Sequence, residues 1–146
     1  MASRKLHARA TRLTAALFAL VPVLGLAQVA DVSVRVVRAD PATGTLEISL
    51  FNSAETFLQE PFLQTSGPVN EDGSYAALFA KVPTGEYAVV VVHDENGNGK
   101  LDNGFLGIGG ESYAFSNDAR PLFGRPSFER AKFAVENDTR IEINVE

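Results

Sequence analysis

The feature that most constrains the fold of this chain is a two-residue alternation of apolar and polar side chains. It first occurs at residues 32–37 and returns at residues 46–50, beyond a Pro-Ala-Thr-Gly turn at residues 41–44. Successive side chains of a β-strand point to opposite faces, so this period indicates strands with one buried face. The short turn between the two runs favours a β-hairpin that pairs them directly.

Further strand candidates follow, separated by turns rich in Gly, Pro and Asn. They are residues 75–80, 86–93, 127–135 and 140–145. The valine run within residues 86–93 is apolar on both faces, so we expect a central strand that is covered on both sides. Residues 52–68 contain Pro61 and Pro68 and are expected to be irregular. The pattern predicts an all-β chain that forms a single β-sandwich domain, immunoglobulin-like or transthyretin-like.

The amino-terminal residues have the composition of an export signal. Four basic residues within the first twelve positions precede an apolar run at residues 13–26. That length fits the core of a signal peptide and is short for a membrane span. Because Gly25 and Ala27 are small enough for a cleavage site, we expect a cleaved signal peptide at residues 1–27, with an uncleaved anchor helix as the alternative. The β-sandwich domain then occupies residues 28–146, has no membrane span, and is periplasmic or secreted in a bacterium.

Composition argues against several functional classes. All 18 acidic residues lie beyond Ala27, together with nine of the 13 basic residues, so the processed domain carries a formal charge of 9 − 18 = −9. Such a domain lacks the positive surface of a nucleic-acid-binding protein. The absence of cysteine excludes disulfides, thiolate zinc sites and a cysteine nucleophile. No nucleophile elbow or histidine pair is present, so we expect a protein that is not an enzyme. The alternative is a metal-assisted hydrolase using His93.

An oxygen-rich loop directly follows the valine strand. Counted from its first aspartate, it places oxygen donors at alternate positions and a glycine at the sixth position, as in the calcium loop of an EF-hand. These donors are Asp94, Asn96, Asn98, Lys100 through its main-chain carbonyl, and Asp102. The twelfth position holds Phe105 instead of a bidentate glutamate, so Glu111 is the expected ligand from outside the loop.

The residue types in this loop suit a hard cation. Calcium accepts carboxylate, amide and carbonyl oxygens together, and no nitrogen or sulfur ligand is required. We therefore expect Ca²⁺ to bind with a modest dissociation constant of about 10⁻⁴ M. The alternative is a plain surface turn, because Asn, Gly and Asp are also common turn residues. His93 is expected to be a strand-end residue that hydrogen-bonds the loop.

Several motifs occur in one order along the chain and together resemble a known family. The motifs are H-D-E-N-G-N-G-K-L-D at residues 93–102, F-S-N at 115–117 and P-S-F-E-R-A-K-F at 126–133. In this order they resemble a family of small exported bacterial proteins catalogued only as a domain of unknown function. The resemblance covers residues 31–146 and departs from the family at Gly109-Gly110, where a proline-containing turn is expected. It implies a secreted β-sandwich and supplies no activity.

The segment between two of these motifs combines polar and aromatic side chains, as ligand-binding patches often do. Tyr113 or Phe115 is expected to stack on a sugar ring, while Asn117 and Arg120 donate hydrogen bonds. The alternative is a crossover loop held by buried aromatic side chains. The sequence thus predicts a non-catalytic, calcium-binding exported module with a protein or glycan partner. A structural envelope protein with an exposed sheet edge is the alternative.

Overall fold

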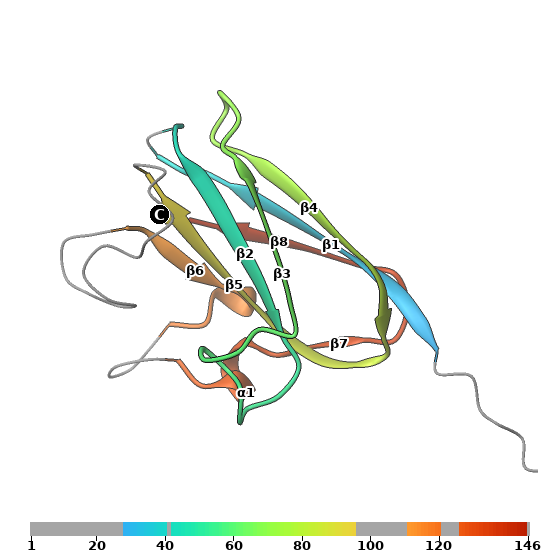
Figure 1. Cartoon of the computed structure of the whole chain (residues 1–146). Coiled ribbons are helices and arrows are strands. Elements are labelled where there is room, and N and C mark those ends of the chain that lie inside the picture. Colours follow the sequence, from blue (N-terminus) through green and yellow to red (C-terminus); the bar gives the residue numbers. More distant parts are fainter. Residues whose placement is uncertain (1–27, 41, 96–110, 121–125, 146) are drawn as a thin grey trace, which may run out of the picture.

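The computed structural model of the chain describes residues 28–40, 42–95, 111–120 and 126–145 (Figure 1). Almost all of these residues lie in strands or in the turns between them. The strands are β1 (Val29–Val37), β2 (Thr45–Phe51), β3 (Leu63–Pro68), β4 (Tyr75–Pro83), β5 (Gly85–Asp94), β6 (Tyr113–Phe115), β7 (Phe133–Val135) and β8 (Thr139–Asn144). The helical elements are the 3₁₀ turn η1 (Ser116–Asp118) and the one-turn helix α1 (Phe128–Ala131).

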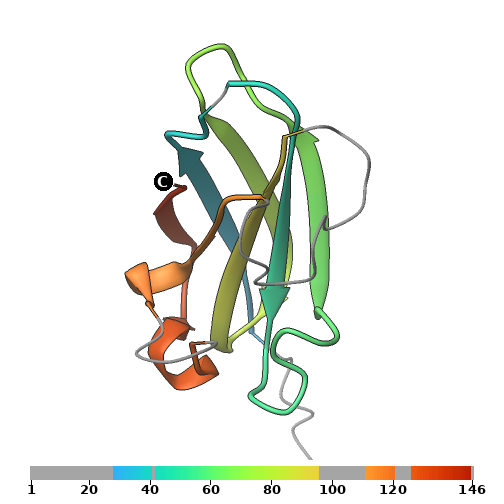
Figure 2. The ribbon, with the colours of Figure 1, turned by 90° about the vertical axis from the view of Figure 1, so that its left-hand side faces the viewer.

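Two sheets pack face to face and form a β-sandwich, which confirms the predicted fold class. One sheet has the strand order β4-β1-β8, and the other has the order β3-β2-β5-β6, with β7 paired to the start of β5. The view in Figure 2 faces the side on which β6 and β8 end the two sheets. The inner faces of the sheets bury apolar side chains against one another, including Val34 from β1, Ile48 from β2 and Val91 from β5. Within the described residues no helix is long and apolar enough to span a membrane.

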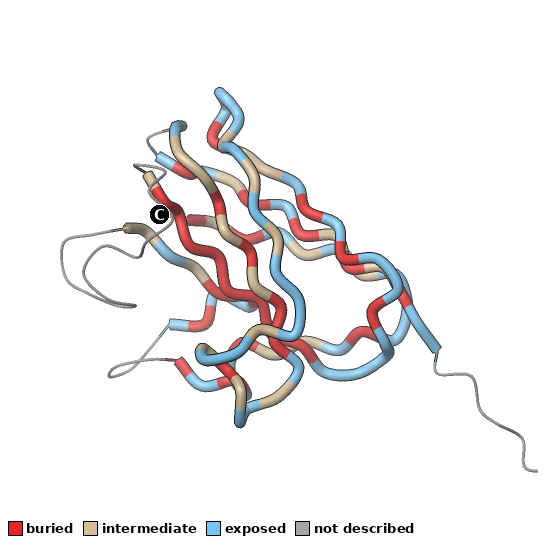
Figure 3. Tube along the Cα trace, in the orientation of Figure 1, coloured by how far each residue is buried: buried red, intermediate tan, exposed pale blue. Residues whose placement is uncertain are grey.

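Strand β5 is buried on both of its faces, as its valine run predicts. Eight consecutive residues from Tyr87 to Asp94 are buried, and they form the long red stretch in Figure 3. Val89 and Val91 point into the space between the sheets, whereas Val90 and Val92 point to the outer face. This strand therefore joins two separate apolar clusters.

The second cluster lies on the outer face of the β5 sheet. It consists of Phe51, Phe57, Ala88, Val90, Val92, Phe115, Ala119, Phe128 and Ala131. Phe57, from the segment between β2 and β3, meets Phe51 with ring centroids 5.3 Å apart and Phe128 with centroids 5.7 Å apart. Both pairs are edge-to-face, the arrangement that aromatic quadrupoles favour. Each fully buried ring contributes about 2 kcal/mol of hydrophobic stabilisation. Helix α1 and the segment after β2 are thus anchored to the sheet through phenylalanines.

The predicted hairpin between residues 32–37 and 46–50 is wrong. Strand β1 pairs with β4 and runs parallel to β8, while β2 pairs with β3 and β5, so the two strands belong to different sheets. The connection turns through left-handed backbone at Arg38 and Gly44, and the Ala39 N–H donates to Gly73 O at 2.9 Å. These contacts carry the chain from one layer to the other. An alternating pattern specifies which face is buried, but it does not specify the neighbouring strand.

Two other segments also differ from expectation. Residues 63–68 form β3 although an irregular path was predicted for residues 52–68. Because β3 is an edge strand and Pro68 is its last residue, the proline removes no hydrogen bond that a central strand would need. The predicted strand at 127–135 begins instead as α1 and becomes a strand only at β7. Phe128 and Ala131 are three positions apart, and one helical turn buries both of them in the second cluster.

Candidate functional site

The end of β5 carries two buried polar side chains, His93 and Asp94. His93 is fully buried, and its Nε2 lies 2.8 Å from the main-chain oxygen of Thr43 in the turn before β2. A carbonyl only accepts, so Nε2 is the donor of this hydrogen bond. No residue of the described chain donates to Nδ1, which is also shielded from solvent. The imidazole therefore ties the end of β5 to the turn that precedes β2.

Asp94 and Glu111 occupy opposed positions on two neighbouring segments. The β5–β6 register pairs Val92 with Tyr113, and the His93 N–H donates to Ser112 O at 2.9 Å. Continuing this register by one residue brings Asp94 opposite Glu111, with both side chains on the outer face of the sheet. Opposed Cβ atoms in an antiparallel ladder are about 5 Å apart. Asp94 is 4% exposed and both carboxylate oxygens of Glu111 are shielded from solvent.

A third carboxylate, which the sequence analysis did not single out, lies on the same face. Thr45 is opposite Asp94 in the β2–β5 ladder, and Glu47 is opposite Val92. Glu47 is therefore a diagonal neighbour of Asp94. In the sequence, Glu47 stands between the buried residues Leu46 and Ile48, and this alternation predicts that its side chain lies on the outer face of the sheet. Even so, the described ranges contain no group of three or more Asp, Glu or His side chains able to hold a metal ion. Of the predicted ligands, Asn96, Asn98, Lys100 and Asp102 lie outside the described residues.

Gly44 determines how closely the β1–β2 connection approaches this strand end. Its φ is +80°, a conformation that side-chain-bearing residues rarely adopt. A Cβ at this position would overlap the main-chain oxygen of Asp94 and approach the Cα of Glu95 to 2.7 Å. Together with the His93–Thr43 contact, this close approach fixes the backbone that carries Asp94.

The structure gives the four predicted ligand-binding residues different surroundings. Tyr113 is 37% exposed, whereas Phe115 is buried and packs against Phe57 with centroids 6.4 Å apart. Asn117 has a φ of 58°, and its Nδ2 donates to Lys132 O at 2.7 Å and to Ala131 O at 3.3 Å. The Asn117 amide therefore closes the end of α1.

Ser116 is an important residue that the sequence analysis overlooked. It is 1% exposed; its hydroxyl donates to Ala131 O at 2.6 Å and accepts from the Val89 N–H at 2.9 Å. One side chain thus joins η1, the centre of β5 and the end of α1. A lone serine gives no periodic or charge signal; only its place in the F-S-N motif pointed to it.

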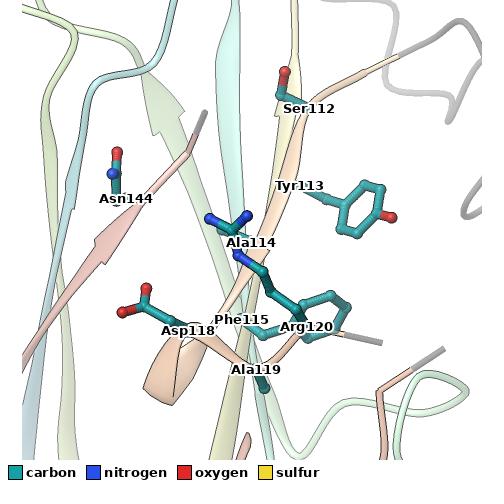
Figure 4. A pocket seen from close by; sticks show the side chains of 8 residues that line it. All are labelled: Ser112, Tyr113, Ala114, Phe115, Asp118, Ala119, Arg120 and Asn144. Carbon is teal, nitrogen blue, oxygen red and sulfur yellow. The ribbon is translucent and has the colours of Figure 1, made fainter. Parts of the chain in front are cut away.

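A pocket of about 430 Å³ lies beside β6, on the side facing β8. Ser112, Tyr113, Ala114, Phe115, Asp118, Ala119, Arg120 and Asn144 line it. Figure 4 shows the Arg120 guanidinium, the Asp118 carboxylate and the Asn144 amide on one side of β6, while the ring of Tyr113 points to the other side. Arg120 is exposed and forms no hydrogen bond or ion pair within the described chain. Of the four predicted ligand-binding residues, Tyr113, Phe115 and Arg120 line this pocket, whereas Asn117 does not.

Comparison with known proteins gives one family match. Residues 34–143 match the model of a bacterial family described as "Uncharacterized protein conserved in bacteria (DUF2141)". No curated protein and no solved structure matches the chain. The match confirms the resemblance to a domain of unknown function that the motifs indicated. Because it spans most of the sequence, the chain belongs to DUF2141, a family of uncharacterized proteins conserved in bacteria.

Proposed function

We propose that this protein is an exported, non-catalytic β-sandwich module that binds Ca²⁺ at the end of β5 and also binds a protein or glycan partner. The observation that carries the proposal is the opposed placement of Asp94 and Glu111 on β5 and the segment entering β6. Two carboxylates that approach one another to about 5 Å would repel by about 3 kcal/mol at the effective dielectric of a protein surface. A divalent cation held by both carboxylates offsets this repulsion.

The remaining ligands come from the loop between the two carboxylates. In the sequence, Asn96, Asn98 and Asp102 follow Asp94 at the alternate spacing of a calcium loop, and Lys100 adds its carbonyl oxygen. Glu111 then takes the part of the bidentate carboxylate that an EF-hand has at its twelfth position. The ligand set is oxygen only, which favours calcium over zinc or copper.

The proposed absence of catalysis rests on the sequence and on the surroundings of His93. The imidazole is fully buried, and its Nε2 faces Thr43 O at 2.8 Å. A general base must come within hydrogen-bond reach of a substrate proton, and a buried, engaged imidazole is poorly suited to this. Export is supported by the basic and apolar amino-terminal segment.

The calcium proposal is tested by thermal unfolding of the full chain, expressed with its leader and purified after export. Mass spectrometry first establishes whether residue 28 is the new amino terminus. At a tenfold excess of Ca²⁺ over its dissociation constant, binding to the native state alone adds about 1.4 kcal/mol of stability. For a domain of this size that raises the melting temperature by about 5 °C relative to a sample with chelator.

Matched variants locate the effect. Glu111→Gln should abolish most of the calcium-dependent shift, whereas Glu60→Gln, which changes an exposed glutamate outside the β5–β6 end, should leave it intact. Magnesium at the same concentration should produce a smaller shift, because it prefers six-coordinate sites and keeps its water ligands. A melting temperature that is the same with Ca²⁺ and with chelator would refute the metal site.

A further inference from the structure

The pocket beside β6 lies where both sheets of the sandwich end. In the described chain β6 pairs only with β5, and β8 pairs only with β1, so each strand has a second edge. The pocket is lined by Tyr113, Ala114 and Phe115 from β6 and by Asn144 from β8. Its polar groups therefore include main-chain groups of a sheet edge as well as side chains.

The hydrogen-bonding direction of β6 follows from its ladder with β5. The His93 N–H donates to Ser112 O, so the main-chain groups of Ser112 point toward β5. These directions alternate along an antiparallel strand. The N–H and C=O groups of Tyr113 and Phe115 therefore point away from β5, toward the pocket side. Among the described residues no main-chain hydrogen bond joins β6 to β8.

The side chains on the pocket side of this edge carry opposite charges, from Arg120 and Asp118. Arg120 and Asp118 form no ion pair or hydrogen bond with any described residue, and the Oδ1 of Asn144 is buried without a hydrogen-bond partner there. The Tyr113 ring points away from the pocket, and Phe115 is 4% exposed. The exposed ring of Tyr113 thus lies across β6 from Arg120 and Asn144, whereas an extended backbone beside these two residues would find unpaired main-chain donors and acceptors.

We propose that this pocket binds an extended peptide segment that pairs with the free edge of β6 and places a carboxylate on Arg120. The inference rests on the proposed function, because it identifies the partner as a protein instead of a glycan. Strand addition supplies main-chain hydrogen bonds, and a charged side chain beside the edge supplies specificity. The guanidinium of Arg120 can bind a carboxylate through two parallel N–H donors. The three residues of β6 limit the pairing to a short segment.

The test uses fluorescence anisotropy with the exported, processed protein. The probe is a fluorescein-labelled heptapeptide of alternating valine and threonine with one central glutamate, and a second peptide carries glutamine at that position. We expect the glutamate peptide to bind about tenfold more tightly than the glutamine peptide. Arg120→Gln should remove this tenfold difference. Arg130→Gln, which changes an exposed arginine of α1 outside the pocket, should leave it unchanged.

Hydrogen exchange provides a readout specific to the sheet edge. On peptide binding, the amides of Tyr113 and Phe115 should exchange at least about tenfold more slowly. A glutamate peptide carrying N-methyl groups at alternate residues should give no such protection, because it lacks the donors for edge pairing. Chitotetraose serves as the glycan probe and should not compete with the peptide.

Several outcomes would overturn the proposal. They are no peptide binding up to about 1 mM, equal affinities for both peptides, or Arg120-dependent binding of chitotetraose. A concentration-dependent dimer that peptide fails to dissociate would mean that a second copy of the chain occupies the edge. The anisotropy is measured in Ca²⁺ and in chelator, so that the two proposals can fail separately. Peptide binding without a calcium-dependent melting shift refutes only the metal site, and the reverse result refutes only the peptide site.

Discussion

Replacing the buried Ser116 by alanine should lower the free energy of unfolding much more than replacing an exposed serine by alanine. The side chain is 1% exposed and its Oγ lies 2.9 Å from the Val89 nitrogen and 2.6 Å from Ala131 O. Ser116→Ala leaves the Val89 N–H, at the centre of β5, without this acceptor. A buried donor left unsatisfied costs about 1–3 kcal/mol.

The second lost contact is partly compensated. Ala131 O also accepts from Asn117 Nδ2 at 3.3 Å, so it retains one donor when the serine hydroxyl is removed. We therefore assign about 2 kcal/mol to the Val89 N–H and less than about 1 kcal/mol to Ala131 O, since a typical net hydrogen bond contributes about 1 kcal/mol. The expected loss of unfolding free energy is about 2–3 kcal/mol.

Urea unfolding followed by circular dichroism measures this loss. The midpoint should fall with an unchanged slope, because the variant removes contacts without changing the surface exposed on unfolding. Ser127→Ala is the matched control: Ser127 is exposed and makes no capping hydrogen bond to α1, so its loss should stay within about 0.5 kcal/mol. Equal effects of the two substitutions would show that Ser116 does not hold η1, β5 and α1 together.

Two further predictions concern the β1–β2 connection and the start of β5. Gly44→Ala should cost about 1–3 kcal/mol in urea unfolding, because φ is +80° and the added Cβ overlaps Asp94 O; an unchanged midpoint would contradict this. Burial raises the pKa of Tyr87 in the folded state above its value of about 10 in the unfolded chain. The stability that the neutral phenol contributes is therefore complete below the pKa of the unfolded chain and is lost as the pH rises through the higher pKa of the folded state. At neutral pH, Tyr87→Phe should lower the free energy of unfolding by about 1 kcal/mol, because the hydrogen bond to Pro83 O is removed. When the pH is raised above about 10, the stability of this variant should fall less than that of the native chain, because phenylalanine does not ionise. Parallel pH–stability curves for the two proteins would refute the second prediction.

The sequence predicted strands more reliably than it predicted their neighbours. The alternation at residues 32–37 and the double-sided valine run within 86–93 correspond to β1 and β5, because side-chain direction in a strand follows a period of two. The same period is satisfied by any partner strand, and so the β1–β2 hairpin was wrong. Helix α1 was missed because its four residues are too few to display a helical period.

At the candidate site, sequence and structure contributed different parts. The loop spacing singled out Asp94, and Glu111 was the ligand expected from outside the loop. The β5–β6 register gives these two residues opposed positions. The alternation in β2 indicates the face on which Glu47 lies, but only the strand pairing shows that Glu47 is a diagonal neighbour of Asp94. The roles of Phe115 and Asn117 depend on α1 and the second cluster, which form only when distant segments meet.

The parallel pairing of β1 with β8 has a consequence for the order of folding. The first described strand lies between β4 and β8, and its partner β8 is the last strand described. Without β8 this sheet has only two strands, which are at best marginally stable in water. The closing contacts also join segments far apart in sequence, and such contacts form slowly. An emerging chain therefore cannot complete this sheet until its last described strand is available.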